Sequence, residues 1–187
     1  MLEKSEKEIR ELIKKAKKGE SEAFGLIYDQ YLERIYRFIY LKVSSREEAE
    51  DLSQQVFMKA WEAMYRFEDE GLPFSSWLYR IARNLVIDFY RTRRQNIVLE
   101  ENIIIEATEN SEERALKNHD GEELIKKALK ELTEEQKDVI ILRFIEGLSY
   151  KEIAKITKKN QPALRILQHR ALNKLRKILK KEQFPSI

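Results

Sequence analysis

Apolar side chains recur at intervals of three and four residues along most of the chain, which is the spacing of one face of an α-helix. Runs of alternating polar and apolar residues, which would indicate β-strands, do not reach a useful length. In the first half the pattern predicts four helices, over residues 2–18, 21–42, 46–64 and 76–94. The chain is therefore predicted to be all-α.

In the second half of the chain the sequence pattern predicts two short helices followed by a long one. Thr133 begins a capping box that starts the first helix, Gly147 can end it with a positive φ, and Ser149 begins a second capping box. A turn over residues 157–160 follows. Pro162 suits the first turn of the long helix, because the amide hydrogen that proline lacks would be unpaired there anyway. This order of elements predicts a helix-turn-helix.

The long helix has one apolar and one polar side. Apolar residues from Leu164 to Ile178 keep a helical spacing and should face a core. The residues turned outward are Arg165, Gln168, His169 and Lys174. A helix that enters the major groove of DNA needs such donor-bearing side chains near its start. A solvated surface helix has the same pattern, but the order of short helix, tight turn and basic helix favours DNA binding.

The formal net charge of +3 hides segments of unlike charge. Residues 124–187 contain 16 Lys and Arg against 7 Asp and Glu, whereas residues 96–123 contain 2 against 9. The basic segment suits the phosphates of a nucleic acid. The acidic segment lacks sustained periodicity, which predicts a flexible linker. We therefore expect two small helical domains, residues 1–95 and 122–187, joined by a linker over residues 96–121.

The composition argues against several classes of function. The chain has no cysteine, which removes disulfides, cysteine-bound zinc and thiol catalysis. Its five glycines form no phosphate-binding loop, its two histidines are isolated, and no Ser, His and Asp set suggests hydrolysis. No apolar run is long enough to cross a membrane, and the charged start does not resemble a signal peptide. We expect a cytoplasmic protein without catalytic residues, metal, cofactor, small-molecule substrate or membrane insertion.

The fourth predicted helix combines basic and aromatic residues on its outer side. Arg80, Asn84 and Arg91 fall near one face. The residues beside them are Arg83, Arg94, Trp77, Tyr79 and Tyr90. Such a surface suits unstacked single-stranded bases, because rings stack on bases while arginines follow the phosphates. Aromatic residues at helical spacing also form cores, so the pattern leaves Trp77 open between the two roles.

Two pairs of segments resemble bacterial RNA polymerase sigma factors. The second conserved region of that family resembles residues 49–61 (AEDLSQQVFMKAW) and 74–84 (FSSWLYRIARN). The fourth conserved region resembles residues 142–154 (LRFIEGLSYKEIA) and 164–171 (LRILQHRA). The linker leaves no room for a third-region domain, so the chain is similar to the small extracytoplasmic-function (ECF) subclass of the sigma-70 family. The resemblance implies a region 2 helical bundle before the linker and a region 4 helix-turn-helix after it.

The resemblance also implies a partner for each set of side chains. The third helix would bind the clamp helices of the largest subunit of RNA polymerase core. The flap of the core polymerase is a further expected contact of the chain. The fourth helix would hold the non-template strand of the minus-10 promoter element, and the helix-turn-helix would read the minus-35 element. The polymerase-binding residues are Asp51, Gln54, Phe57 and Lys59. The minus-10 residues are Trp77, Arg80, Arg83, Asn84, Asp88 and Arg91, with Arg93 and Arg94 as further phosphate contacts. The minus-35 residues are Arg143, Tyr150, Arg165, Gln168, His169 and Arg170.

As a member of this group the chain would direct promoter-specific transcription initiation and catalyse nothing itself. An anti-sigma factor, which holds many relatives inactive, is a further expected partner. Gln55 and Pro162 depart from the family pattern, and Asp88 has an alternative role as an ion-pair partner of Arg91 one turn on. Two other classes of function stay open. One is a helix-turn-helix regulator whose N-terminal helices bind a ligand or dimerise, and the other is a helical protein-binding adaptor.

Overall fold

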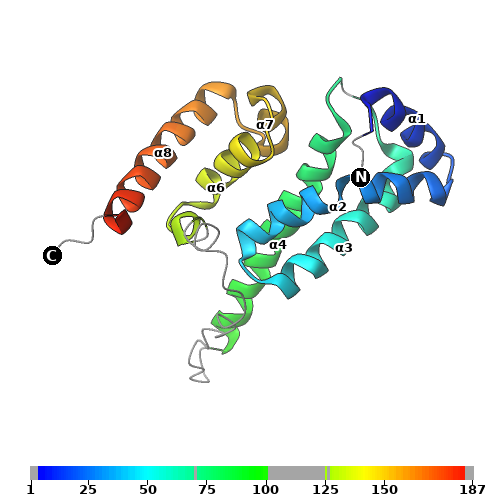
Figure 1. Cartoon of the computed structure of the whole chain (residues 1–187). Helices are drawn as coiled ribbons and strands as arrows, with labels where there is room; N and C mark the ends of the chain where they lie inside the picture. Colours follow the sequence, from blue (N-terminus) through cyan, green and yellow to red (C-terminus); the bar gives the residue numbers. More distant parts are fainter. Residues whose placement is uncertain (1–3, 70, 101–124, 126, 184–187) are drawn as a thin grey trace.

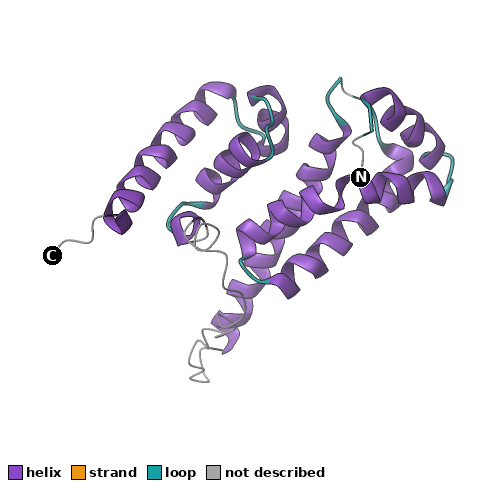
Figure 2. Cartoon of the chain, in the orientation of Figure 1, coloured by secondary structure: helices purple, strands orange, loops and turns teal. Residues whose placement is uncertain are grey.

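The computed structural model describes residues 4–69, 71–100, 125 and 127–183, and all the regular structure of these residues is helical (Figures 1 and 2). The elements are α1 (Glu6–Ala16), α2 (Ser21–Val43), α3 (Arg46–Ala63), the 3-10 turn η1 (Met64–Arg66), α4 (Phe74–Glu100), α6 (Glu134–Ile140), the π-helical turn η2 (Ile141–Ile145), α7 (Tyr150–Thr157) and α8 (Gln161–Gln183). The prediction of an all-α chain is confirmed for these residues. Most of the predicted linker, residues 101–121, lies outside them.

The N-terminal block is a bundle of α1 to α4 in which α2 packs on the other three helices. Its core is made of the apolar faces that the sequence predicts, and Ile27, Phe38 and Leu78 are fully buried. Helix α1 is shorter than predicted, because Ser5 caps it by accepting a hydrogen bond from the Glu8 amide while the Glu8 side chain reaches back. The Ser and Glu of this capping box are visible in the sequence, so the start of α1 could have been predicted from them.

The C-terminal block is the predicted helix-turn-helix. Thr133 and Ser149 each form a capping box at the start of α6 and α7. Gly147 has a φ of +73°, a conformation that side chains with a Cβ rarely adopt, and it turns the chain between η2 and α7. Helix α8 packs on α6 and α7, and Ile153 of α7 and Leu164 of α8 are fully buried in this block. Helix α8 thus lies on a packed support with its other side outward.

Helix α4 begins earlier and ends later than predicted. The Pro73 carbonyl accepts a hydrogen bond from the Ser76 amide, so the helix begins at Phe74, and Ser75 lies inside it rather than capping it. The helix continues to Glu100, through residues that the sequence analysis assigned to the linker. No glycine or proline occurs between residues 95 and 100 to stop it.

The two blocks lie against each other rather than apart. Helix α7 packs along α4, and η2 contacts α2, while the long helix α8 lies on the far side of the C-terminal block in Figure 1. The sequence analysis predicted two blocks on a tether and did not predict this contact. It decides which of the candidate residues are open to a partner.

Candidate nucleic-acid interface

The outer face of α8 carries the candidate residues for reading duplex DNA. Arg165, His169 and Arg170 are exposed, and Gln168 is half-buried. Asn160 holds the start of the helix, because its Oδ1 atom accepts a hydrogen bond from the Ala163 amide at 2.8 Å. The first turn of α8 therefore presents cationic and amide side chains from a fixed backbone, which is the geometry that major-groove reading requires.

Tyr150 organises two of these side chains. Its ring centroid lies 4.4 Å from the Arg165 guanidinium carbon and 5.1 Å from that of Arg143. Its hydroxyl donates a hydrogen bond to the Gln168 side chain. Arg143 in turn donates to the Leu148 carbonyl at 2.8 Å, which ties it to the turn before α7. The structure thus groups four of the six predicted minus-35 residues, with Arg143 and Tyr150 in supporting positions.

Ile166 is a residue of this face that the sequence analysis missed. Its side chain is 54% exposed although it is large and apolar. It precedes His169 and Arg170 by three and four residues, so it shares their side of the helix. The signal was present in the sequence, since Ile166 falls off the apolar stripe that begins at Leu164.

A second candidate site is a hollow at the start of α4. Its volume is about 160 Å³, and its lining includes Phe67, Ser76, Trp77 and Arg80. The Ser76 hydroxyl is buried and has no hydrogen-bond partner among the described residues. A buried hydroxyl without a partner is costly, so this oxygen favours a ligand that offers a polar group.

Trp77 combines the two roles that the sequence left open. Its ring centroid lies 5.1 Å from that of Phe67 and 5.2 Å from that of Phe74, so the side chain belongs to an aromatic cluster. It is only partly buried, and its remaining surface lines the hollow. The ring is thus held by packing while one side stays available for stacking.

The middle of α4 divides into open and occupied side chains. Asn84, Asp88 and Arg91 are exposed, and Asp88 pairs with Arg91 at 2.9 Å, which is the alternative role considered for it. Arg83 is not open, because its Nε atom donates to the Asp138 carboxylate of α6 at 2.7 Å. Arg93 pairs with Glu48 at 3.0 Å. The predicted phosphate contacts are therefore only partly available in this arrangement.

Two tyrosines of α4 do not face outward as the sequence suggested. Tyr79 is fully buried, and its hydroxyl donates to the Glu146 carboxylate. Burial and the neighbouring carboxylate raise the pKa of Tyr79, so the hydroxyl stays protonated. Burial also raises the pKa of Tyr90 to about 12, and its hydroxyl donates to the Lys42 carbonyl at 2.8 Å. The Tyr79 ring is therefore closed to stacking, whereas the Tyr90 ring is only partly buried.

Helix α3 presents three of the four predicted polymerase-binding residues. Asp51, Gln54 and Lys59 are exposed, whereas Phe57 is 3% exposed. The Phe57 ring packs edge-on against Tyr28 with centroids 4.7 Å apart. The prediction that Phe57 contacts the polymerase directly is therefore corrected: its side chain is part of the core. Met58, next to it, is 62% exposed and was not predicted.

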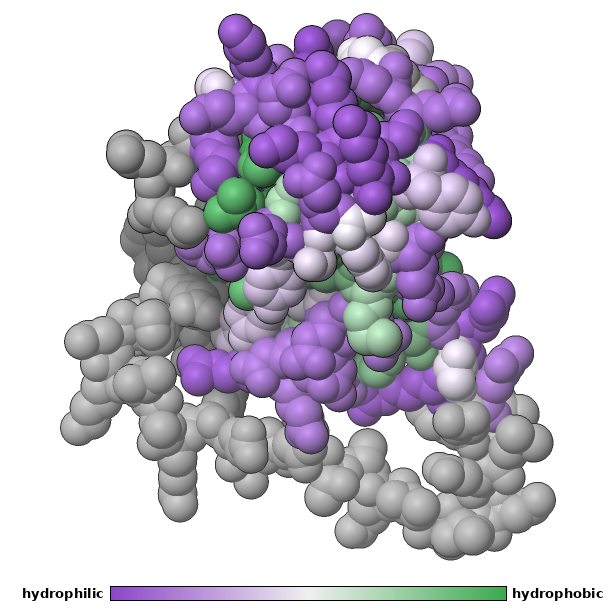
Figure 3. Space-filling model, turned by 90° about the vertical axis from the view of Figure 1, so that its right-hand side faces the viewer, coloured by the Kyte–Doolittle hydropathy of each residue, from purple (hydrophilic) through white to green (hydrophobic). Residues whose placement is uncertain are grey.

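Other surface features point to no further class of site. The face turned to the viewer in Figure 3 is mostly hydrophilic, with small separate hydrophobic patches. Within the described residues no helix is both long and apolar enough to cross a membrane. The same residues contain no group of three His, Asp or Glu side chains placed to hold a metal ion.

The two blocks match two family models. Residues 27–96 match Sigma-70 region 2, and residues 128–177 match Sigma-70, region 4. The first match covers α2 to α4, and the second covers the helix-turn-helix. The candidate surfaces described above all lie within these matches.

Curated relatives cover most of the chain. The ECF RNA polymerase sigma factor SigW of Bacillus subtilis (strain 168) is 32% identical over 182 residues, which are 92% of this chain and 97% of SigW. The ECF RNA polymerase sigma factor SigX of the same strain is 34% identical and covers 83% of each chain. The ECF RNA polymerase sigma factor BldN of Streptomyces coelicolor is 36% identical over 90% of this chain, which spans 65% of BldN.

Solved structures show the same fold. The sigma factor RpoE from Bartonella quintana, solved in complex with the anti-sigma factor NepR, is 30% identical with a TM-score of 0.69, and covers 84% of this chain and 96% of that one. CnrH, solved in complex with the cytosolic domain of CnrY, is 25% identical with a TM-score of 0.70, and covers 92% and 97%. Both likenesses span the two blocks together.

Proposed function

Since this chain belongs to the ECF group of the sigma-70 family of RNA polymerase sigma factors, we propose how its residues divide the work of promoter recognition. A sigma factor directs the polymerase to promoters, and the polymerase performs the chemistry. The chain is then a recognition subunit with two DNA-binding surfaces and one polymerase-binding surface. The exposed, donor-rich face of α8 is the observation that carries the proposal.

The α8 face reads the minus-35 element. Arg165, His169 and Arg170 reach base edges and phosphates in the major groove. Tyr150 holds the Arg165 guanidinium through its ring, and fixes Gln168 through its hydroxyl. Ile166 lies on the same face and contacts a thymine methyl group, which is the apolar feature of the major groove.

The hollow at the start of α4 holds an unpaired base of the minus-10 element. Trp77 offers a ring for stacking, Ser76 a buried hydroxyl that has no partner in the described part of the chain, and Arg80 a cation at the rim. Taking a base out of a duplex costs a few kcal/mol, and a site that holds the base shifts the opening equilibrium without ATP. Asn84, Asp88 and Arg91 continue this surface along α4.

The outer face of α3 binds the polymerase core at the clamp helices of its largest subunit. Asp51, Gln54 and Lys59 supply polar contacts, and the exposed Met58 among them adds apolar area. Phe57 supports this face from the core. An anti-sigma factor is a further partner, because the structurally similar sigma factor RpoE from Bartonella quintana was solved in complex with the anti-sigma factor NepR.

Run-off transcription separates this function from its rivals. The purified chain is added to core polymerase on a library of genomic promoters, and its binding to the same duplexes is measured without polymerase. We expect transcripts from a small set of promoters only when both components are present. A helix-turn-helix regulator would bind its duplex tightly alone and start no transcription, and a protein-binding adaptor would be indifferent to Arg165→Ala and Arg80→Ala.

A further inference from the structure

Four cations of the N-terminal block face the C-terminal block. Arg34, Arg37 and Lys42 lie on α2, and Arg83 lies on α4. The groups that meet them come from the other block. They are the carboxylates of Glu134, Asp138 and Glu146. We call this set of seven side chains the clasp.

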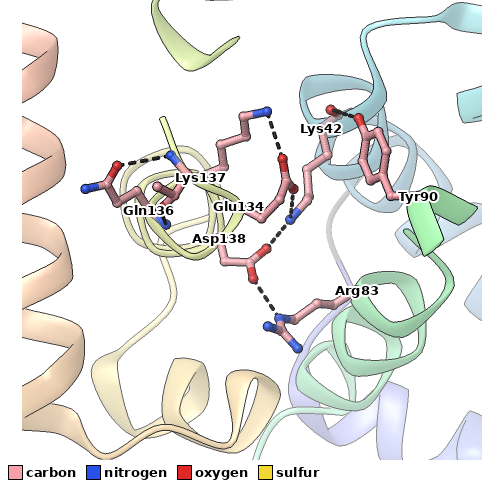
Figure 4. Close-up of polar contacts among 8 residues, drawn as sticks. Lys42, Arg83, Tyr90, Glu134, Gln136, Lys137 and Asp138 are labelled. Carbon is pink, nitrogen blue, oxygen red and sulfur yellow. Dashed lines mark hydrogen bonds and ion pairs between the residues drawn. The ribbon is translucent and has the colours of Figure 1, made fainter. Parts of the chain in front are cut away.

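One half of the clasp is centred on Asp138, whose residue is 1% exposed (Figure 4). One carboxylate oxygen accepts from Arg83 at 2.7 Å, and the other accepts from Lys42. Glu134 lies 3.1 Å from the same Lys42 amine. Burial acts to raise the pKa of Glu134, but Lys42 and Lys137 outweigh it and lower that pKa, so the group is ionised.

The other half is centred on Glu146, whose side chain is 0% exposed. Arg37 approaches it with two nitrogens, at 2.9 and 3.1 Å. The Nε atom of Arg34 lies 3.4 Å from the carboxylate, and its Nη2 atom donates to the Glu146 carbonyl at 3.1 Å. The Tyr79 hydroxyl donates to the same carboxylate. Among the described residues, the side chains paired with the Glu146 carboxylate therefore belong to the N-terminal block.

A buried carboxylate needs a cationic or donor partner, because its desolvation is otherwise uncompensated. Asp138 and Glu146 find these partners 55 to 112 residues away in the chain, in the other block. Within the described residues the buried apolar side chains of both blocks belong to one cluster, so the carboxylates add ion pairs to an apolar contact. The clasp therefore serves the contact between the blocks.

The contact also covers groups that promoter DNA would use. Arg83, a minus-10 candidate, is held by Asp138. Lys155 of α7 lines the hollow that contains Ser76, Trp77 and Arg80. The docked C-terminal block therefore borders the minus-10 surface, and its Asp138 carboxylate competes with DNA for Arg83.

Docking is also incompatible with reading both promoter elements at once. The elements are about 25 base pairs apart, which is about 85 Å along a duplex at about 3.4 Å per pair. Helix α7 is packed directly on α4, so their two blocks cannot be separated by that distance while the clasp is closed. The chain between residues 100 and 125 reaches at most about 90 Å when extended, which lets the blocks part.

We propose that the clasp closes an autoinhibited form of the free chain, in which Asp138 and Glu146 occupy cations of the N-terminal block until polymerase and promoter separate the two blocks. This inference rests on the proposed function, because it takes the two blocks to be the minus-10 and minus-35 readers. At Arg83 the Asp138 carboxylate acts in place of a DNA phosphate. Binding of polymerase and opening of the clasp are then coupled equilibria.

The cysteine-free sequence allows a direct test with the full-length chain. Glu22→Cys on α2 and Lys177→Cys on α8, both exposed, carry a donor and an acceptor dye. The clasp variant is Asp138→Asn/Glu146→Gln, which keeps side-chain size and removes two charges. The matched control is Glu131→Gln/Glu135→Gln, which removes two charges from exposed positions of the same block. A second variant, Arg34→Gln/Arg37→Gln, opens the clasp from the opposite side and touches no proposed promoter contact.

Both clasp variants should lower energy transfer relative to the wild type and the control, and added core polymerase should lower it in the wild type. Affinity of the free chain for a single-stranded minus-10 oligonucleotide should rise about tenfold in Asp138→Asn/Glu146→Gln, a usual size for coupling between sites. The control should change less than about twofold. Equal energy transfer in wild type and both variants, or equal gains in variant and control, would overturn the proposal. Run-off transcription tests the proposed function separately. The proposed function requires only that the chain bound to core polymerase starts transcription, whether or not the free chain is closed.

Discussion

The two proposed DNA-binding surfaces of this sigma factor are built from similar side chains and have different surroundings. The α8 face, with Arg165, His169 and Arg170, is exposed on the side of its block away from the bundle. The α4 surface is bordered by the other block, which holds Arg83 and lines the hollow beside Arg80. The difference indicates that the free chain can present its duplex reader while its single-strand reader is partly covered.

The largest effect is expected at the open surface. Arg165→Glu should weaken minus-35 recognition by ~2 kcal/mol or more, about thirtyfold, because a good contact to a base edge is lost and a like charge faces the phosphates. Run-off transcription from the cognate promoter measures the loss. Binding to a single-stranded minus-10 oligonucleotide should not change.

A matched control for this prediction lies further along the same helix. Arg176→Glu makes the same charge change at an exposed position of α8 that is not a proposed contact. It should reduce transcription far less than Arg165→Glu does. Equal losses from the two variants would show that net charge, and not the α8 start, determines recognition.

The covered surface should respond differently. Asn84→Ala should slow open-complex formation about tenfold, or ~1.4 kcal/mol, since Asn84 offers a polar contact to unpaired bases. Affinity for core polymerase should stay as in the wild type. Permanganate footprinting of the melted region measures opening, and Thr92→Ala, an exposed change on the same helix, is the control. A parallel loss of core affinity would indicate misfolding instead.

Most of the fold could be predicted from the sequence, because its signals are local. The apolar spacing of α2 to α4 and the capping boxes of Thr133 and Ser149 depend on neighbours a few residues away. The same is true of the α8 face, where Arg165 and His169 are exposed as expected. Helix ends were less certain, and α4 begins at Phe74 because of the Pro73 carbonyl rather than a serine cap.

The contact between the blocks could not be predicted, because its signals are not local. Glu146 and Asp138 look like ordinary surface acids of a helix-turn-helix until Arg37 and Arg83 are brought beside them. Tyr79 looked like an outward ring for the same reason, although it is fully buried. A pattern that identifies DNA-binding chemistry does not tell whether that chemistry is open or already paired.

Removing the buried Tyr79 hydroxyl tests the contact between the two blocks. Tyr79→Phe removes the hydrogen bond to Glu146 but keeps the ring against Phe38, whose centroid lies 5.4 Å away. The equilibrium between docked and open forms should shift by ~1 kcal/mol towards open, about fivefold, as for one hydrogen bond. Energy transfer between the Glu22→Cys and Lys177→Cys dyes measures the shift.

Tyr90→Phe is the matched control for that change. Its hydroxyl also donates one hydrogen bond, but the acceptor is the Lys42 carbonyl of the same block. The variant should lose stability in thermal unfolding without changing the energy transfer. Opening of the blocks to the same extent in both variants would mean that loosening the bundle, and not loss of the Glu146 contact, separates them.

An effect as small as that of Tyr79→Phe is expected at Ile166, the one apolar side chain of α8 proposed to face a base. Ile166→Ala should weaken minus-35 binding by ~1 kcal/mol, about fivefold, the value of roughly one buried methylene or methyl group. Replacing thymine by uracil at each minus-35 position in turn removes only the methyl group. One such position should weaken the wild type about fivefold and leave Ile166→Ala unchanged, because the two changes delete opposite sides of one contact. If uracil weakened both proteins equally, Ile166 would not face a base, and the open surface would read its element through polar groups alone.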